Sequence, residues 1–569
     1  NWYITQHLLL KGTFSITRTV EHGDRFLDPL SKQNAEPLSM THLYSGELRK
    51  SNGESFNWDM NLLLAYNRTF DKHNVNFTVG INTKEDYSES GSAFYKGFPS
   101  GSLNSPNYAK EIYEKPTQSE GKSRLFGAIA TVNYSFRDIY LFDFSGRIDG
   151  SSKFGSDRKY APFWSTGFGI NIHNYGFLKD NAWINQLKLR VSYGQTGKVN
   201  FPAYAATTMY ETLFDEWYIT GYGAVLKALG NKDLTWEKTD KLSVGIETKT
   251  FHDRLTVDFE YYYNKTIDLV NDVTLSQTSG FSTYKDNMGQ VANKGVELKL
   301  RADIYRDRNW NVALWGNMAH NKNEILKISD SQKAYNERVA AYYKNEALYQ
   351  ETLGLSHGAE YSVPLPQYEE GASLTSIWAV RSLGIDPTTG KEIFLNRDGS
   401  IADKWNAAQE VVVGNTEPKC SGAFGLNLSY KNWTLFASFL YEWGGQEYNQ
   451  TLVNNVENAD LVNKNVDLRV LTDRWKKPGD IAQFKDIKDR GMTTLPTSRF
   501  VQDKALVRLN SLNVSYDFNR DWIKKHLRMN LLRLEASTSD LINWSSIKQE
   551  RGLSYPRSWK VEFSLKAQF

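Results

Sequence analysis

The final residues of the chain, 559–569, alternate strictly between apolar and polar side chains. The apolar members are Trp559, Val561, Phe563, Leu565, Ala567 and Phe569. Because successive side chains of a strand point to opposite faces, such a strand has one apolar face and one polar face. An aromatic last residue is unusual in a soluble strand, whose end frays in water. The pattern therefore favours a transmembrane β-barrel strand, with one face in lipid and the other towards a wet lumen.

The same alternation recurs along the chain, in segments 56–66, 187–193, 241–249, 254–264, 296–304 and 433–443. In segment 433–443, Trp433 lies at one end of the apolar face and Tyr441 and Trp443 at the other. At ~3.3 Å per residue and a tilt of about 40°, this face spans roughly 25 Å of membrane height. One such strand fits a soluble sheet, but the repetition favours a membrane barrel.

The composition agrees with a barrel. By length alone, 569 residues would suggest about three or four soluble domains. Mean hydropathy is −0.54, and no apolar run approaches the ~20 residues that a membrane helix needs. A barrel can be polar on average, since only alternate residues face lipid. The net charge of +3 does not favour a nucleic-acid partner. Cys420 is the only cysteine, which excludes an internal disulfide and a cysteine metal site.

Short and long connections alternate between the expected strands. Short polar turns are expected at 71–74, 137–138, 252–254, 306–309, 431–432 and 519–521. Long polar connections are expected at 85–121, 150–160, 197–232, 267–288, 324–370, 397–420, 447–500 and 542–556. An outer-membrane barrel has short periplasmic turns and long extracellular loops. We therefore predict an all-β, antiparallel transmembrane barrel with about 17 to 19 strands in this chain, with Phe569 on the periplasmic side. Residues 1–50 are the least distinctive part.

We predict no catalytic residue, no metal site and no cofactor. The stretch 396–400 (NRDGS) lacks the acidic positions of a calcium loop, so a polar turn on Asp398 and Gly399 is the better interpretation. Asp258 and Glu260 share a polar strand face and are expected to solvate the lumen rather than form a hydrolase pair. No His spacing matches a metal site.

Three aromatic residues in the 197–232 connection are candidate ligand-binding residues: Trp217, Tyr218 and Tyr222. Aromatic rings stack on sugar faces and also bury peptide side chains, so they do not select between these ligands. The alternative is that they pack the connections against one another.

Several strings, in a fixed order along residues 123–569, resemble the SusC/RagA-type TonB-linked (TonB-dependent) outer-membrane transporters of Bacteroidetes. They are 147–155 (RIDGSSKFG), 188–197 (KLRVSYGQTG), 234–239 (LTWEKT), 244–247 (VGIE), 261–266 (YYYNKT), 293–297 (NKGVE), 384–390 (GIDPTTG), 474–480 (RWKKPGD) and 555–556 (YP). No single string is decisive, and the match rests on their order. Residues 1–122 are compatible but less distinctive.

The resemblance implies a nutrient importer in the bacterial outer membrane, taking up glycan or peptide fragments. It implies two partners, a SusD-like surface lipoprotein over the extracellular mouth and the TonB complex acting through a plug domain. It also implies a barrel of about 22 strands. No plug, TonB box or signal peptide is visible, and residues 1–5 already read as strand. We therefore expect 1–569 to be a partial barrel with long extracellular loops, without the N-terminal plug and first strands.

Two alternatives stay open at this point. One is a siderophore- or cobalamin-type TonB-dependent receptor. The other is a protein that does not transport, either an outer-membrane enzyme or a soluble glycan-binding β protein. A need for detergent and heat-modifiable migration on a gel would separate a barrel from the soluble protein.

Overall fold

The computed structural model of the protein describes residues 1–31, 46–154, 158–178, 181, 183–199, 201, 204, 206–274, 283–287, 289–461, 466–548 and 558–569. Within these residues, eighteen strands form one antiparallel sheet. They are β1 (Trp2–Thr5), β2 (Leu8–Leu27), β3 (Gly46–Phe70), β4 (His73–Phe98), β5 (Glu111–Phe136), β6 (Tyr140–Ser151), β7 (Tyr160–Asn171), β8 (Ile184–Lys198), β11 (Glu237–Thr250), β12 (Leu255–Ile267), β15 (Gln290–Arg306), β16 (Trp310–Lys327), β21 (Cys420–Tyr430), β22 (Trp433–Tyr448), β23 (Val501–Asp517), β24 (Leu531–Thr538), β25 (Asn543–Ser545) and β26 (Val561–Gln568).

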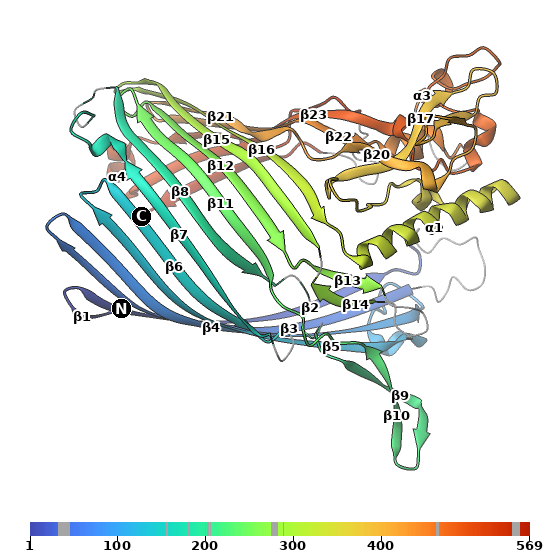
Figure 1. Ribbon diagram of the computed structural model, residues 1–569, viewed down its shortest axis with the longest axis horizontal. Helices are drawn as coiled ribbons and strands as arrows, with labels where there is room; N and C mark the ends of the chain where they lie inside the picture. Colours follow the sequence, from blue (N-terminus) through green and yellow to red (C-terminus); the bar gives the residue numbers. More distant parts are fainter. Residues whose placement is uncertain are drawn as a thin grey trace.

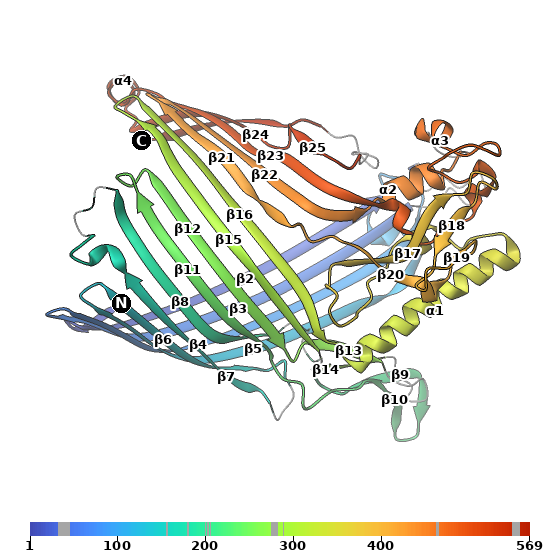
Figure 2. The ribbon, with the colours of Figure 1, turned by 45° about the horizontal axis from the view of Figure 1, so that its top comes forward.

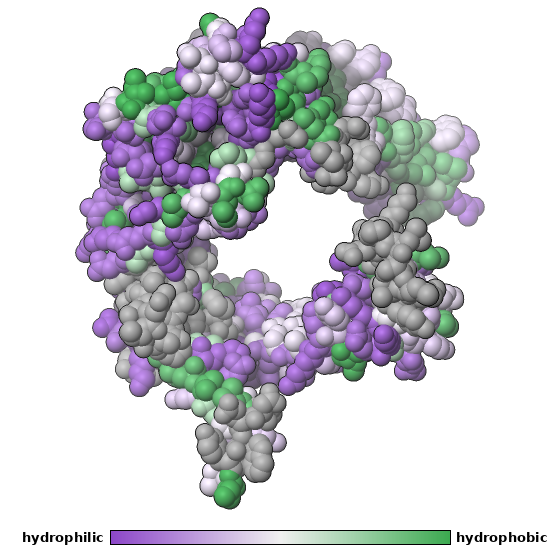
Figure 3. Space-filling view, turned by 90° about the vertical axis from the view of Figure 1, so that its right-hand side faces the viewer, coloured by the Kyte–Doolittle hydropathy of each residue, from purple (hydrophilic) through white to green (hydrophobic). Residues whose placement is uncertain are grey.

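The sheet curls into a barrel wall whose strands follow one another in chain order. From β1 to β24 each wall strand pairs antiparallel with the next; β25 also pairs with β23, and β26 pairs with β24. Figure 1 shows the wall from the side, and Figure 2 shows the strands crossing it at a steep tilt. Viewed from the end of the barrel, the molecule forms a ring around an open centre (Figure 3). The predicted all-β barrel is confirmed, and its strand number lies within the predicted range.

The predicted alternation sets which side chains point outward. Large apolar residues in the middle of the wall strands are 38–47% exposed, and examples are Val244, Phe259, Leu300, Leu314 and Phe424. Such a continuous exposed apolar surface would be unstable in water, so it is the lipid-facing surface. None of the described helices is both long and apolar enough to span a membrane.

The short turns and the long connections lie at opposite ends of the barrel, and both chain ends lie with the short turns (Figure 1). Five of the six predicted short turns are confirmed by the strand bounds, for example Asp71 and Lys72 between β3 and β4. Asp71 and Lys431 adopt positive φ angles of 51°, which a tight turn requires.

The sixth turn, predicted at 519–521, is instead the start of a helix, α4 (Arg520–Leu527). The side chain of Asn519 accepts hydrogen bonds from the backbone of Asp521 and Trp522 and so caps the helix N-terminus. Ile523 is buried, which fixes the helix against the end of the wall. The polar residues that suggested a turn are therefore a helix cap.

The predicted 85–121 loop is also wrong in its extent. Strand β4 continues to Phe98 and β5 begins at Glu111, so both project far beyond the apolar band. A polar strand face does not end a strand when its neighbour pairs with it, and β4 and β5 stay paired to Lys96 and Glu111.

The remaining long connections contain structure of their own. Two hairpins are formed by β9 (Met209–Tyr218) with β10 (Gly221–Ala228), and by β13 (Val270–Thr274) with β14 (Thr283–Asn287). A four-stranded sheet contains β17 (Ser376–Ile385), β18 (Glu392–Leu395), β19 (Ile401–Ala402) and β20 (Glu410–Asn415). The helices are α1 (Asp330–Leu353), α2 (Gln450–Leu452), α3 (Arg469–Thr472) and a π-helical turn, η8 (Val453–Glu457). Single turns of 3-10 helix are η3 (Pro106–Tyr108), η4 (Ile172–Asn174), η6 (Ala359–Ser362), η7 (Ala407–Gln409), η9 (Ile487–Gly491) and η10 (Ser498–Phe500).

Helix α1 lies within the predicted 324–370 loop. Its N-terminus carries a capping box in which Ser329 and Gln332 exchange side-chain and backbone hydrogen bonds. This Ser-x-x-Gln spacing was present in the sequence and is a recognised start signal for a helix. We name the sheet β17–β20, helix α1 and residues 447–461 and 466–500 the mouth assembly, because they gather at the end of the barrel opposite the short turns (Figure 2).

Candidate functional site

The lumen-facing side of the wall carries a network of charged side chains on neighbouring strands. Arg190 on β8 donates to Asp258 at 3.1 Å and to Glu260 at 2.7 Å, both on β12. Ser243 on β11 donates to Glu260 at 2.6 Å. The two carboxylates therefore share a guanidinium across three strands, which supports the prediction that they solvate the lumen. Such a wall can face water and polar solutes.

Further towards the mouth, the lumen face carries a hydrogen-bond network of asparagine amides and a tyrosine hydroxyl. Tyr262 on β12 donates to Asn321 on β16 at 2.9 Å, and Asn321 donates to Asn293 on β15 at 3.2 Å. Gly295 leaves room for this contact, because a Cβ atom there would lie 2.6 Å from the Tyr262 hydroxyl. The strings YYYNKT and NKGVE thus meet across β12 and β15.

A second pair of strings meets near the outer end of β6–β8. Phe154 packs against Trp236 with ring centroids 4.7 Å apart, and Phe163 contacts the same ring at 5.6 Å. The indole N–H of Trp236 donates to the carbonyl of Lys159 at 3.3 Å. These residues belong to one buried cluster that also includes Leu234. The strings at 147–155 and 234–239 therefore anchor long connections to the wall.

The strings GIDPTTG and RWKKPGD meet inside the mouth assembly. Gly390 has a φ of +73°, and a Cβ atom there would lie 2.5 Å from the ring of Trp475. The Trp475 indole donates to the carbonyl of Pro387 at 2.9 Å, and the Gly479 amide donates to the same carbonyl at 2.8 Å. Arg474 is 4% exposed and donates to backbone carbonyls, including that of Lys485. These family strings are structural, which their spacing alone did not reveal.

A buried ion cluster joins three parts of the mouth assembly. Arg499 lies on η10, directly before β23. Its guanidinium donates to Glu392 on β18 at 2.9 Å and to Glu457 on η8 at 2.6 Å. The side chain of Arg499 is 11% exposed, that of Glu392 9% and that of Glu457 0%. Burial alone would lower the pKa of Arg499, but the two carboxylates together outweigh it and raise that pKa, so the guanidinium stays charged. Nearby, burial lowers the pKa of Lys485 to about 8.

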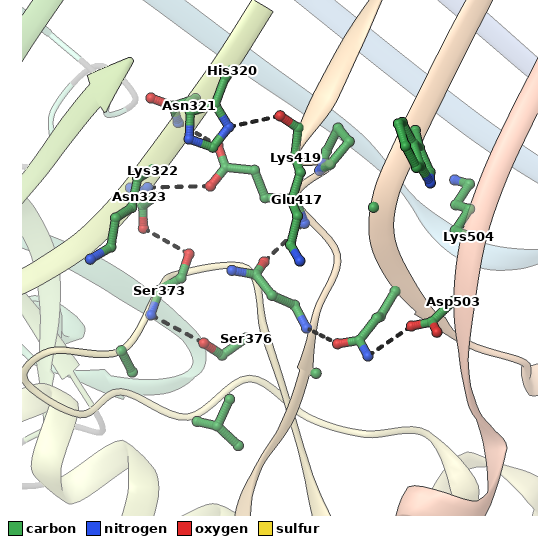
Figure 4. A pocket seen from close by; sticks show the side chains of 18 of the residues that line it. His320, Asn321, Lys322, Asn323, Ser373, Ser376, Glu417, Lys419, Asp503 and Lys504 are labelled. Carbon is green, nitrogen blue, oxygen red and sulfur yellow. Dashed lines mark hydrogen bonds between the residues drawn. The ribbon is translucent and has the colours of Figure 1, made fainter. Parts of the chain in front are cut away.

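A cavity of about 750 Å³ opens where the wall meets the mouth assembly. Its lining includes His320 and Lys322 on β16, Lys419 before β21, Trp443 on β22 and Lys504 on β23. Figure 4 shows His320 and Lys322 on one side of the cavity and Lys504 on the other. The ring of His320 bonds to the carbonyl of Lys419 at 2.7 Å.

The three predicted ligand-binding aromatics lie on the β9–β10 hairpin. Trp217 and Tyr222 are direct partners in its register, and Tyr218 precedes the turn. The hairpin projects away from the ring, as Figures 1 and 3 show, and does not line the cavity described above. Tyr222 is 62% exposed, whereas the side chains of Trp217 and Tyr218 lie outside the described residues. Their role in binding stays a prediction.

The stretch 396–400 forms the polar turn that the sequence predicted. Asp398 accepts hydrogen bonds from the backbone and hydroxyl of Ser400 at 2.9 and 2.7 Å, and Gly399 has a φ of +85°. These bonds lower the pKa of Asp398. In the described part of the chain, no three His, Cys, Asp or Glu side chains form a group that could hold a metal.

Comparison with known proteins identifies the family. Residues 6–536 match the model of the TonB dependent receptor-like, beta-barrel family, and the chain belongs to that family. Its members are outer-membrane transport proteins and not enzymes, so the predicted location and the predicted non-enzymatic class are confirmed.

Curated relatives support the predicted resemblance. TonB-dependent receptor P3 of Formosa agariphila is 28% identical over 494 residues, covering 85% of this chain and 47% of that protein. TonB-dependent receptor SusC of Bacteroides thetaiotaomicron is 27% identical over 318 residues, covering 54% of this chain and 31% of that protein. The chain spans about half the length of the first curated relatives it matches.

Solved structures of the RagAB peptide importer share the fold. In the open-open state the TM-score is 0.81 at 23% identity, covering 99% of this chain and 59% of that chain. A further structure of the RagAB peptide transporter gives a TM-score of 0.78 at 23% identity, covering 96% and 57%. The predicted likeness to SusC and RagA is thereby confirmed at the level of family and fold.

Proposed function

We propose that this chain forms most of the barrel of a TonB-dependent importer that takes up glycan or peptide fragments. The observation that carries the proposal is the polar lumen face, in which Arg190, Asp258, Glu260 and Ser243 form a continuous network on three adjacent strands. A barrel with a lipid-facing apolar side and such an inner side provides a passage for polar solutes. Family membership adds the energised, TonB-dependent class.

Loop lengths support one orientation in the membrane. The short turns, helix α4 and Phe569 lie at one end, and the mouth assembly lies at the other (Figure 1). Short turns face the periplasm in outer-membrane barrels. The mouth assembly is therefore extracellular. Protease added to intact cells should cut within 447–500 before it cuts turn 71–74 or turn 252–254, and the reverse order would contradict this orientation.

The proposed partners are a SusD-like surface lipoprotein at the mouth and the TonB complex, acting through a plug-bearing part of the protein. The 324–370 and 447–500 connections offer the surface, and the Arg499 cluster ties the second of them to β18. A prearranged surface loses less conformational entropy on binding than a flexible loop. We propose a contact above ~1,000 Å², larger than ordinary crystal-packing contacts. The outer-membrane lipid surrounds the apolar band, and no nucleic-acid partner is proposed.

The proposed substrate is an oligosaccharide or a peptide. The likeness of this chain to SusC and to the peptide importer RagAB supports both classes. They do not favour a siderophore or cobalamin receptor. Trp217, Tyr218 and Tyr222 remain the proposed ligand-binding aromatics, and they lie on the projecting β9–β10 hairpin.

The test is uptake by cells that carry the whole protein. Fluorescently labelled peptide and glycan oligomers are offered to cells with the wild-type gene, with the gene deleted and with TonB deleted. We expect uptake of one of these classes, lost in both deletion strains. A pull-down from native membranes in mild detergent should recover a lipoprotein and a plug-bearing polypeptide. Uptake that persists without TonB, or recovery of neither partner while uptake continues, would contradict the proposal.

A further inference from the structure

An apolar groove lies on the outer surface of the wall beside the cavity shown in Figure 4. It has a volume of about 450 Å³ and is lined by Phe424, Tyr441, Trp443, Val507 and Trp544, among others. The register places Phe424, Tyr441 and Val507 on the lipid side, since Phe424 pairs with Phe439 and Tyr441 pairs with Val507. Trp443 is 69% exposed and Trp544 is 58% exposed.

With the mouth assembly extracellular, as proposed above, the aromatic residues place the groove at the level of the outer membrane interface. Trp443 lies on the outward face of β22 just before a register shift at Gly444, and the strand reaches the mouth assembly a few residues later. Tryptophan and tyrosine gather at membrane interfaces because their rings are apolar with one polar atom. An acyl chain lying in this groove would therefore keep its head group just outside the apolar band.

The groove continues into the larger cavity, because Trp443 and Ala505 line both. This cavity exists because β21 begins only at Cys420, whereas β16 continues outward to Lys327. The pairing of β16 with β21 ends at Ala319 and Ser421, so the wall has a recess beyond these residues.

The recess carries cations. Lys322 lies on the same face of β16 as the lipid-facing Leu314, and it is the register partner of Lys294 on β15. Lys322 and Lys419 both line the cavity and are exposed. Among the described residues, Lys419 and Lys294 have no carboxylate within ion-pair distance, and Lys322 has only Glu324 at 3.6 Å.

The other charges at the cavity are engaged elsewhere. Glu417 accepts hydrogen bonds from the side chain of Asn321 and the backbone of Asn323. Asp503 accepts from Gln446 at 3.1 Å. Lys504 is paired with Glu442 at 3.3 Å and Glu447 at 3.2 Å. Among the described residues, Lys419 and the neighbouring Lys294 thus have no carboxylate partner, and Lys322 has only the 3.6 Å contact with Glu324, so these three cations can face an external group.

We propose that this surface binds a phosphorylated lipid of the outer leaflet. One acyl chain lies in the groove between Phe424, Trp443 and Trp544, and a phosphate of the head group lies against Lys322 and Lys419. The choice of a phosphorylated lipid follows from the lysines beside the apolar groove, because basic residues at a membrane surface attract anionic head groups. The inference rests on the proposed orientation, with the mouth assembly extracellular, and is independent of which substrate is imported.

The experiment uses the whole protein, purified from outer membranes in a mild detergent and analysed by native mass spectrometry. The probes are bisphosphorylated lipid A, the same lipid with its phosphates removed, and inorganic phosphate. We expect the wild-type protein to bind the phosphorylated lipid much more tightly than the dephosphorylated one. Inorganic phosphate at the same concentration should not displace it, since the acyl chain contributes to binding.

Two variants divide the site. Lys322→Gln with Lys419→Gln should weaken binding of phosphorylated lipid A about thirty-fold, by the strength of two lysines near an anionic membrane surface. Ala505→Phe fills the groove and should weaken binding of both lipid forms. The matched control is Lys431→Gln, which removes a lysine at the opposite end of the same β21–β22 hairpin and should leave binding unchanged.

Three results would overturn the proposal. The first is equal binding of phosphorylated and dephosphorylated lipid by the wild-type protein, a comparison that needs no variant to fold. The second is an equal loss of binding in the control and in the double variant. The third is displacement by inorganic phosphate alone, which would make the recess a site for free phosphate.

Discussion

Removing the buried guanidinium of Arg499 should open the mouth assembly without unfolding the barrel. In Arg499→Ala, Glu392 and Glu457 would lose their shared cation while 9% and 0% exposed. Breaking a buried ion pair from one side costs about 3–5 kcal/mol, because a charge is left buried without a partner. Arg499 also lies 4.4 Å from the ring of Phe500, a contact that alanine would remove as well.

The effect should be local, because Arg499 on η10 links β18 to η8, and among the described residues it makes no bond to the lumen network. Hydrogen exchange with mass spectrometry on the whole protein in detergent measures it. Amides of β18 and of 453–461 should exchange at least a hundredfold faster, since 1.4 kcal/mol is about a factor of ten. Amides of β12 should be unchanged.

The control variant removes a solvent-exposed ion pair at the surface of the mouth assembly. Lys404 pairs with Glu351, and the two side chains are 69% and 56% exposed. Lys404→Ala should cost only about 0–1 kcal/mol. Arg499→Lys keeps the charge and loses the forked geometry, so it should fall between the two. Equal exchange in Arg499→Ala and Lys404→Ala would refute the idea that the buried cluster holds the mouth assembly together.

Three further predictions concern the lipid face, pH and a packing contact. Leu565→Arg places a charge on the lipid face and should lower barrel stability by ~2–4 kcal/mol near the midplane and less near an interface. Glu562→Arg on the lumen face should cost much less. Comparable losses of stability for the two variants in urea titrations would show that the alternation is misassigned. Burial raises the pKa of Glu410 to about 7, so the folded protein holds this proton more tightly than the unfolded chain and stability falls as pH rises from about 4.5 through 7. Relative to Glu410→Gln, the wild-type mouth assembly should lose roughly 3 kcal/mol across that window, and parallel pH profiles of hydrogen exchange would contradict this. Trp475→Ala should destabilise the assembly by about 3–5 kcal/mol, and unchanged exchange around Gly390 would disprove the packing role.

The alternation of side chains predicted the wall because lipid and lumen impose opposite requirements on successive residues. The alternation did not predict strand ends in the parts of strands where neither face meets lipid. A loop was predicted at 85–121, yet β4 continues to Phe98 and β5 begins at Glu111, because each strand pairs with the other. Hydroxyls such as those of Ser92 and Thr117 also bond across the two strands at 2.8 Å. Beyond the membrane, polarity on both faces no longer marks the end of a strand.

The mouth assembly was the part least predictable from the sequence. Its contacts join residues far apart in the chain, as Trp475 does with Gly390 and Arg499 does with Glu392. Helix α1 is the exception, since its capping box was a local signal. The candidate aromatics Trp217 and Tyr222 were selected by residue type, and residue type does not determine whether a hairpin faces the lumen or projects from the rim.

Cysteine labelling along β12 tests most directly that this chain is a barrel wall between lipid and a wet lumen. Single cysteines replace Val257, Asp258, Phe259 and Glu260 in a Cys420→Ser background of the whole protein in its native membrane. A charged, water-soluble maleimide should label positions 258 and 260 and leave 257 and 259 unlabelled. Equal labelling at all four positions, or faster labelling at 257 and 259, would contradict the account.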